Sequence, residues 1–217
     1  MRGNIYINNA TKKFMTAVVL DDISVSFEAG KIHGIVGRNG SGKTMLLKCL
    51  CGFVTLTSGQ IFYEQDCIGK ENEIPSDIGV IIESPGFLDH ESGYRNLKVL
   101  AMLKSRIKKE DIINAMINVG LDPTSKKKVG KYSLGMKQRL GIAQAIMELP
   151  KYLFLDEPMN GLDMRGIEEV RILLKKLKNE GTTIVLASHN KDDISILCDD
   201  WIEMDQGKII KKYGLSI

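Results

Sequence analysis

The sequence has few cysteines and no long apolar run. Its four cysteines (Cys49, Cys51, Cys67 and Cys198) stand at spacings that fit neither a disulfide framework nor a zinc site. No stretch approaches the roughly 18 consecutive apolar residues that a membrane helix needs. The first residues contain no apolar segment that could direct secretion. We therefore expect a cytoplasmic protein without direct membrane insertion, so that any membrane role depends on a partner.

The charge of the chain is nearly balanced. There are 30 basic and 27 acidic residues, and the net charge of +3 gives no indication of a nucleic-acid partner. The apolar share of 43% and the charged share of 26% are typical of a soluble globular protein. A length of 217 residues suits a single domain, 1–217, with room for an inserted lobe.

Short runs of β-branched and apolar residues alternate with helical patterns, which indicates an α/β protein. Near the amino terminus, three strands joined by turns predict an antiparallel sheet: 5–7, 18–27 and 59–64. We expect a core with a parallel sheet flanked by helices, formed by strands 31–36, 78–82, 152–155 and 183–187, helices 43–52, 164–179 and 191–197, and a closing hairpin at 201–211. Three more helices, 93–104, 109–120 and 134–148, predict a helical lobe inserted at about 86–148.

A glycine-rich segment follows the strand 31–36. It matches the pattern G-x-x-x-x-G-K-[ST] with Gly37, Arg38, Asn39, Gly40, Ser41, Gly42, Lys43 and Thr44. Glycines let successive backbone N–H groups curve around phosphate oxygens, and the helix that begins near Lys43 points its positive end at the same charge. Lys43 supplies a cation to the β- and γ-phosphates, and the Thr44 hydroxyl is a hard ligand for Mg²⁺. The loop therefore predicts a P-loop NTPase core that binds ATP with Mg²⁺.

Two acidic residues follow the buried strand 152–155. We expect Asp156 to hold Mg²⁺ through its water shell, because this ion keeps several waters and takes few protein oxygens. Glu157 is then placed to act as the general base on the attacking water. An acidic pair after a strand is often only a helix cap, but behind a phosphate loop it predicts ATP hydrolysis.

The segment from Tyr132 to Arg139, YSLGMKQR, resembles the signature motif of ABC transporter nucleotide-binding domains, usually written LSGGQ. The resemblance extends over essentially the whole chain and implies that the inserted lobe is the ABC helical subdomain. It also implies that Ser133 and Gly135 contact ATP held by a second nucleotide-binding subunit, since a hydroxyl and a backbone N–H at a helix amino terminus suit a γ-phosphate.

Three further residues fit the same family. Asp163, in the segment NGLD, resembles the D-loop acid that couples the two ATP sites. His189 matches the switch histidine that contacts the γ-phosphate, which would add it to Lys43 and Glu157 as a catalytic residue. Phe14 stands where the family places an aromatic ring that stacks on adenine, although an aromatic residue between two strands is also common in a core.

The sequence departs from the family at two positions. Glu83 stands where the Q-loop glutamine is expected, so that a group with a donor is replaced by one that offers only oxygens when ionised. We hypothesise that Glu83 is a Mg²⁺ ligand and transmits a signal to the membrane partner. Leu134 replaces a signature glycine, which puts close backbone approach at that point in doubt. These variants resemble the bacitracin-resistance and lantibiotic-immunity branch of ABC exporters.

The resemblance implies an ATPase subunit of an exporter of peptide antibiotics or other drugs. Such a subunit would form a homo- or heterodimer and would act with integral membrane permease subunits at the inner face of the plasma membrane. Three alternatives remain: a soluble ABC ATPase that acts on ribosomes or DNA, a regulatory module that binds nucleotide without hydrolysis, and an importer subunit. A single compact set of motifs disfavours the first, and the intact Lys43, Asp156, Glu157 and His189 disfavour the second.

Overall fold

A computed structural model describes residues 3–64, 66–68, 75, 77–83, 86–103 and 107–214. One of its two sheets is antiparallel and has the strand order β2-β1-β4-β5. Its strands are β1 (Ile5–Phe14), β2 (Ala17–Phe27), β4 (Ser58–Tyr63) and β5 (Asp66–Ile68). The predicted amino-terminal sheet is confirmed. However, β1 runs far beyond the predicted 5–7, because its polar second half pairs with β2 on one side and β4 on the other, and β5 is not predicted at all.

The second sheet has the order β10-β9-β3-β8-β7-β6. Its strands are β3 (Ile32–Val36), β6 (Ile78–Ile81), β7 (Tyr152–Asp156), β8 (Thr183–Ser188), β9 (Asp200–Asp205) and β10 (Lys208–Tyr213). All neighbours pair in parallel except β9 and β10, which form an antiparallel hairpin. The predicted parallel core and closing hairpin are therefore confirmed. The carboxyl ends of β3, β7 and β8 lie side by side, where ligands bind in sheets of this kind.

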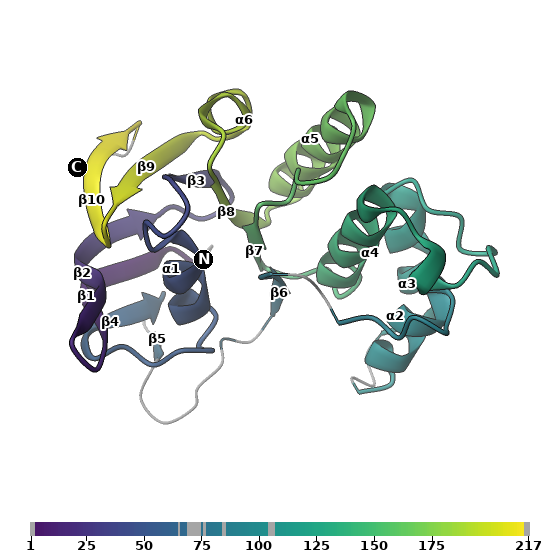
Figure 1. The fold of residues 1–217 in the computed structure, drawn as a ribbon, viewed down its shortest axis with the longest axis horizontal. Coiled ribbons are helices and arrows are strands. Elements are labelled where there is room, and N and C mark those ends of the chain that lie inside the picture. Colours follow the sequence, from purple (N-terminus) through teal and green to yellow (C-terminus); the bar gives the residue numbers. More distant parts are fainter. Residues whose placement is uncertain are drawn as a thin grey trace.

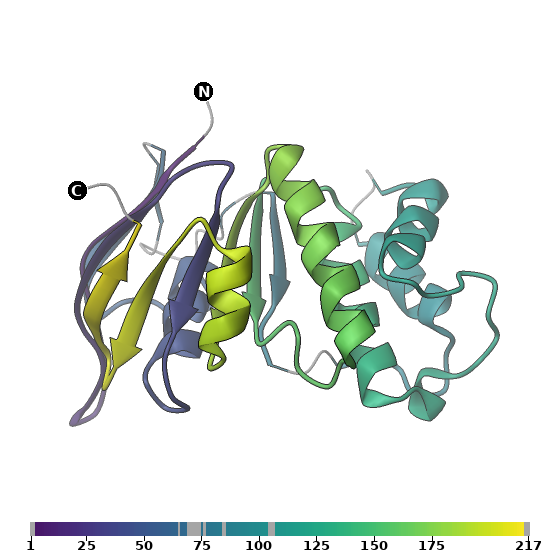
Figure 2. The ribbon, with the colours of Figure 1, turned by 90° about the horizontal axis from the view of Figure 1, so that it is seen from above.

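Helices cover both faces of the second sheet (Figures 1 and 2). α1 (Lys43–Leu50) lies between the two sheets, and its buried leucines share a hydrophobic cluster with strands of both. α5 (Met164–Asn179) and α6 (Lys191–Leu197) cover the opposite face. Side chains of β8 alternate between two hydrophobic clusters. Ile184 and Leu186 pack in the cluster with α5 and α6, and Val185 and Ala187 pack in the cluster with α1. α1 ends at Leu50, two residues before the predicted end, and Gly52 adopts φ +72° after its last turn, as a glycine at a helix end commonly does.

Three helices, which we call the lobe helices, lie beyond β6 on the other side of the sheet from α1 (Figure 1). They are α2 (Gly93–Ala101), α3 (Lys109–Asn118) and α4 (Leu134–Ile146), and a short 3₁₀ turn, η1 (Val129–Lys131), precedes α4. α2 and α3 start at the predicted residues, and so does α4. α2 ends at Ala101 instead of residue 104, which lies outside the described residues, while α3 and α4 each end two residues earlier than predicted.

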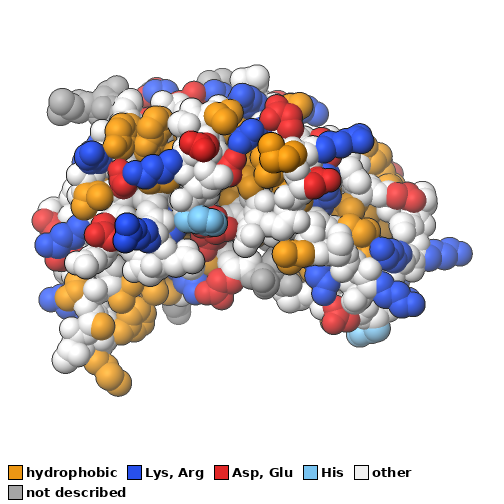
Figure 3. Space-filling model, turned by 45° about the horizontal axis from the view of Figure 1, so that its top comes forward, with side chains coloured by type: hydrophobic (Ala, Val, Ile, Leu, Met, Phe, Trp, Pro, Cys, Tyr) orange, Lys and Arg blue, Asp and Glu red, His pale blue; other side chains and the backbone are white. Residues whose placement is uncertain are grey.

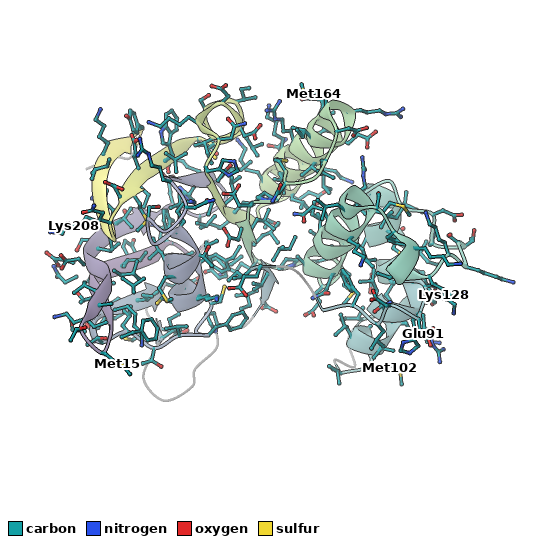
Figure 4. The ribbon with its side chains drawn as sticks, in the orientation of Figure 1. Met15, Glu91, Met102, Lys128, Met164 and Lys208 are labelled. Carbon is teal, nitrogen blue, oxygen red and sulfur yellow. The ribbon has the colours of Figure 1, made fainter. Side chains whose placement is uncertain are left out.

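Charged side chains of both signs lie intermixed on the face shown in Figure 3, as the near balance of charge in the sequence leads one to expect. Figure 4 places Lys128 and Met102 on the lobe, far from Met15 at the fully exposed turn between β1 and β2. Within the part of the chain that the structure describes, no helix is both long enough and apolar enough to cross a bilayer.

Candidate functional site

The loop between β3 and α1 has backbone conformations that favour glycine. Gly40 and Gly42 have φ values of +82° and +104°, a region that residues with a Cβ rarely adopt. At Gly37 an added Cβ would lie 2.4 Å from the carbonyl oxygen of Met204, so a larger residue does not fit. At Gly40 an added Cβ would meet nothing within 4 Å, so the loop is open on that side. The loop predicted from the sequence is thus present, in the predicted setting between a strand and a helix.

The side chain of Lys43 folds back over this loop. Its Nζ donates hydrogen bonds to the carbonyl oxygens of Gly37 at 2.7 Å and Arg38 at 3.1 Å, and the residue is buried. An ammonium group has three donors. One therefore remains for a further acceptor, and a phosphate oxygen above the loop fits its charge.

The hydroxyl of Thr44 and the carboxylate of Asp156 meet at the mouth of the loop. Thr44 Oγ1 donates to Asp156 Oδ2 at 2.6 Å. An octahedral Mg²⁺ that keeps several waters could bind the Thr44 hydroxyl directly and reach Asp156 through one of its waters, as expected from the sequence. Among the described residues, no three His, Cys, Asp or Glu side chains group closely enough to hold a metal alone. Mg²⁺ at this position would need further ligands, which water and phosphate can supply.

Asp156 lies in a partly buried position at the end of β7. Burial raises the pKa of its carboxyl above the usual value, and the negative charges of Glu157 and Glu83 act in the same direction. The hydrogen bond from Thr44 and the charge of Lys43 lower the pKa but do not cancel the effect of burial. The ionised form thus lacks a full positive partner in the protein, and a bound cation would stabilise it.

The carboxylate of Glu157 is held by the end of β8 and the residue after it. Its Oε1 accepts one hydrogen bond of 2.9 Å from the backbone N–H of His189. The same oxygen also lies 2.9 Å from Nδ1 of the His189 ring. Its Oε2 accepts from the Ser188 hydroxyl at 3.3 Å. Glu157 and His189, both predicted site residues, are therefore in direct contact, while the role of Ser188 was not anticipated.

These groups line one cleft of about 430 Å³. Its walls are formed by Val19, Asn39, Gly40, Gly42, Lys43, Thr44, Met45, Lys48, Glu83, Asp156 and Glu157. Val19, Met45 and Lys48 escaped the sequence analysis, because their contribution depends on how β2 and α1 pack and not on a motif. A larger hollow of about 600 Å³ lies near the amino ends of β7 and β8, but none of the predicted site residues lines it.

Glu83 follows β6 and reaches the edge of this cleft. Its Oε1 accepts a hydrogen bond of 2.6 Å from Lys48 Nζ on α1, and its side chain is 65% exposed. The structure thus gives the negative charge of Glu83 a protein partner that the sequence analysis did not anticipate.

The predicted signature residues lie away from the cleft, at the start of α4. Ser133 is the N-cap of this helix and accepts a hydrogen bond of 3.2 Å from Met136 N–H. Leu134, the departure from the motif, is 66% exposed and lies against Gly161, where an added Cβ would be 2.6 Å from its side chain. Gly135 faces the Gly161 carbonyl, from which an added Cβ would be 3.0 Å away. Gly135 therefore packs closely against the loop that precedes α5 in the same chain.

Asp163 and Phe14 also lie outside the cleft walls. Asp163 is the N-cap of α5, and its Oδ1 accepts a hydrogen bond of 2.8 Å from Gly166 N–H. Phe14 is half exposed at the end of β1, with Lys12 Nζ 4.7 Å from its ring centroid. An exposed ring is available for stacking, but it does not line the cleft.

The glycine loop between β3 and α1, together with the acidic end of β7, a parallel strand separated from β3 by β8, defines a P-loop nucleoside triphosphatase. The family model of the ABC transporter matches residues 20–160, which include the loop and both acids. The chain belongs to the ABC transporter family and is an ABC-type ATPase that binds nucleotide.

Several curated proteins resemble the chain over nearly its whole length. An uncharacterized ABC transporter ATP-binding protein of Bacillus subtilis (strain 168), YybJ, is 44% identical over 205 residues, 94% of either chain. The bacitracin transport ATP-binding protein BcrA of Enterococcus faecalis is 40% identical, over 98% of this chain and 70% of that protein. The lantibiotic transport ATP-binding protein SrtF of Streptococcus pyogenes is 38% identical, over 97% of this chain and 91% of that protein.

Solved structures agree on the fold. The dimeric structure of MJ0796, a bacterial ABC transporter cassette, superposes with a TM-score of 0.86 over 98% of this chain and all of that one, at 21% identity. The agreement covers both sheets and the lobe helices, as the predicted fold class requires.

Proposed function

We propose that the chain is the ATP-hydrolysing subunit of an exporter for peptide antibiotics, and that it drives a separate membrane permease. The observation that supports hydrolysis most directly is the cleft that Lys43, Thr44, Asp156 and Glu157 line together, with His189 in contact with the Glu157 carboxylate. The transport of bacitracin and of a lantibiotic, for which two relatives are named, supports the class of cargo. No relative described above favours the importer or the soluble ATPase.

The residues of the loop would bind the triphosphate. Backbone N–H groups of the loop from Gly37 to Gly42, and those at the amino-terminal end of α1, offer donors to phosphate oxygens. Lys43 would turn one donor to the β- and γ-phosphates while keeping its bonds to the loop. Phe14 would contribute an aromatic surface for adenine after movement of the turn that follows β1.

Thr44 and Asp156 would hold Mg²⁺, and Glu83 would join them once it leaves Lys48. When bound, Mg²⁺ offsets the charge of the phosphates. Lys43 and the imidazole of His189 would offset charge on the γ-phosphate from the protein side.

Glu157 would accept a proton from the attacking water. Hydrogen bonds from Ser188 and from the backbone of His189 orient its carboxylate, so the side chain loses little further rotational freedom when it accepts the proton. Orientation of this kind is a large part of what an enzyme adds to a proton transfer.

The site of one chain lacks the signature contacts, because Ser133 and Gly135 lie at the start of α4 and outside the cleft walls. We infer that a second nucleotide-binding subunit, identical or homologous, supplies them in trans. Asp163 would then lie between the two ATP sites. The whole chain, 1–217, would act as one ATP-binding domain, in which the lobe at about 86–148 moves on closure and passes the movement to a permease at the inner face of the plasma membrane.

The test is the variant Glu157→Gln, which preserves shape but removes the base. We expect ATP binding to remain, hydrolysis to fall by about a hundredfold or more, and an ATP-dependent dimer to accumulate in size-exclusion chromatography. Glu180→Gln, an exposed change at the end of α5, should hydrolyse ATP as the wild type does. Hydrolysis by Glu157→Gln at the wild-type rate would remove Glu157 from this role.

The exporter assignment has its own test in cells. Cells that express the chain together with a permease from an adjacent gene should tolerate a higher concentration of a cyclic peptide antibiotic or a lantibiotic. Lys43→Ala should abolish this gain. Equal tolerance with and without functional ATPase would contradict the assignment, whatever the hydrolysis assay shows.

A further inference from the structure

A single side chain of α4 reaches from the lobe helices to the backbone next to the hydrolytic site. Gln138 Nε2 lies 3.3 Å from the carbonyl oxygen of Glu157 and 3.1 Å from that of Pro158. Both partners can only accept hydrogen bonds, so the amide of Gln138 must present its nitrogen to them. The contact joins α4 to residues 157–158, which lie just after β7 and belong to no helix or strand.

The backbone that receives these bonds is one that needs support. Glu157 has a φ of +49°, in the left-handed region that costs a residue with a Cβ about 1–2 kcal/mol. Its N–H donates to the carbonyl of Ala187 at 2.9 Å, which fixes the peptide on its amino-terminal side. On the carboxyl-terminal side, Gln138 donates to the carbonyls of Glu157 and Pro158, and Asn160 N–H also donates to the Glu157 carbonyl at 3.1 Å. Because the strained residue is held at both sides, its side chain has one direction, toward Ser188 and His189.

The residue after Gln138 ties the same turn of α4 to α5. Arg139 donates to Glu169 on α5 at 2.7 Å and to the carbonyl of Val119 at the end of α3 at 2.6 Å. Successive residues of α4 therefore contact the chain before and after the segment 159–163. Ser133 and Gly135 stand on the first turn of this helix, so a displacement of that turn also displaces the amide that holds Glu157.

We propose that Gln138 is a positioning residue for Glu157, which transmits the position of the signature turn to the carboxylate of its own subunit. The inference rests on the proposed role of Glu157 in hydrolysis. When Ser133 and Gly135 engage the nucleotide of the other subunit, α4 is fixed, and the two Gln138 hydrogen bonds then fix the backbone of Glu157. ATP bound in one site thereby readies the base of the other.

The test compares Gln138→Glu and Gln138→Met with Gln144→Glu in the purified full chain. The first variant keeps the shape of the side chain but turns an oxygen toward two carbonyls; the second removes both donors without adding charge. Gln144 lies six residues further along α4, and no hydrogen bond of its side chain is found among the described residues. It is the matched control for a change of glutamine on the same helix.

Both Gln138 variants should lose about tenfold to a hundredfold in kcat, because the base is misplaced. Their affinity for fluorescent ADP should stay within about twofold of wild type, since Gln138 does not line the cleft. Without nucleotide, amide hydrogen exchange in the peptide 157–163 should be faster than in wild type. Gln144→Glu should match wild type in all three measurements. A kcat within twofold of wild type in both Gln138 variants would overturn the inference, as would equal losses of kcat and ADP affinity.

A Gln138 variant would also lose kcat if the whole protein were less stable. Urea unfolding measures that loss of stability directly. In that case hydrogen exchange would also be faster in all peptides and not only in 157–163. Exchange that rises throughout would overturn the positioning role. If wild-type protein and Gln144→Glu hydrolyse ATP while the Gln138 variants do so equally well, only this inference fails. If wild-type protein itself fails to hydrolyse ATP, the proposed function fails.

Discussion

The Thr44 hydroxyl donates a 2.6 Å hydrogen bond to Oδ2 of Asp156, joining the first turn of α1 to the end of β7 across 112 positions of sequence. The bond brings two hard oxygens together where the backbone of the phosphate loop ends. It also lowers the pKa of a carboxyl that burial raises, and so favours the ionised form that a cation requires.

The first prediction concerns this pair and Mg²⁺. Thr44→Ala removes one oxygen, and the Mg²⁺ concentration that gives half-maximal hydrolysis should rise by about tenfold or more. Thr44→Ser keeps the hydroxyl and should stay close to wild type. The same titration of fluorescent ADP binding against Mg²⁺ gives a measurement independent of turnover. If Thr44→Ala and Thr44→Ser respond alike to Mg²⁺, the hydroxyl is not a ligand.

The second prediction concerns Glu83 and Lys48. The Glu83 side of their ion pair is largely exposed, so the pair contributes little to stability and acts mainly by directing the carboxylate. If Glu83 is a Mg²⁺ ligand, Glu83→Gln should raise the half-saturating Mg²⁺ concentration in the presence of saturating nucleotide. Lys48→Met should lower it, because the carboxylate no longer has a competing partner.

The control for this pair is the double variant. With Gln at position 83, the additional change Lys48→Met should have little effect on the Mg²⁺ requirement, since no charged carboxylate is left to release. If Glu83→Gln changes neither the Mg²⁺ dependence nor the hydrolysis coupled to transport, then Glu83 is a passive variant of the Q-loop glutamine.

The sequence predicted the parts of the site that depend on local motifs. The loop from Gly37 to Thr44 and the acidic end of β7 were found because each function needs particular residue types at fixed spacing. The same reasoning found the order of the core elements, since buried parallel strands are continuous apolar runs. It missed the second half of β1, whose polar residues show no strand pattern and become a strand through pairing: Asn8 and Thr11 pair with β4, while Lys12 and Lys13 pair with β2.

Contacts between distant segments could not be read from the sequence. The bond of Lys48 to Glu83 spans 35 positions, and that of Gln138 to Glu157 spans 19. Neither follows from propensity or periodicity, because each depends on how two elements pack. The left-handed backbone of Glu157 is also invisible in the sequence, where glutamate gives no sign of a positive φ.

The last prediction concerns His33, a buried histidine on β3, the strand that leads into the phosphate loop. His33 is fully buried, with Nδ1 2.6 Å from Oδ1 of Asp200 and Nε2 2.8 Å from the carbonyl oxygen of Glu28. Since a carbonyl only accepts, Nε2 bears a proton. Asp200 is itself only 3% exposed, and the pair joins β3 to β9 beneath the site.

His33→Leu removes the partner of a buried carboxyl and should lower the free energy of unfolding by about 3–5 kcal/mol. The double change His33→Leu with Asp200→Leu leaves no unpaired polar group and should cost less than the single change, because two apolar side chains can pack where a buried pair stood. Urea unfolding followed by circular dichroism measures both variants against wild type. If His33→Leu costs less than about 1 kcal/mol, or the double change costs as much as His33→Leu alone, then the pair does not stabilise the strand that carries the phosphate loop.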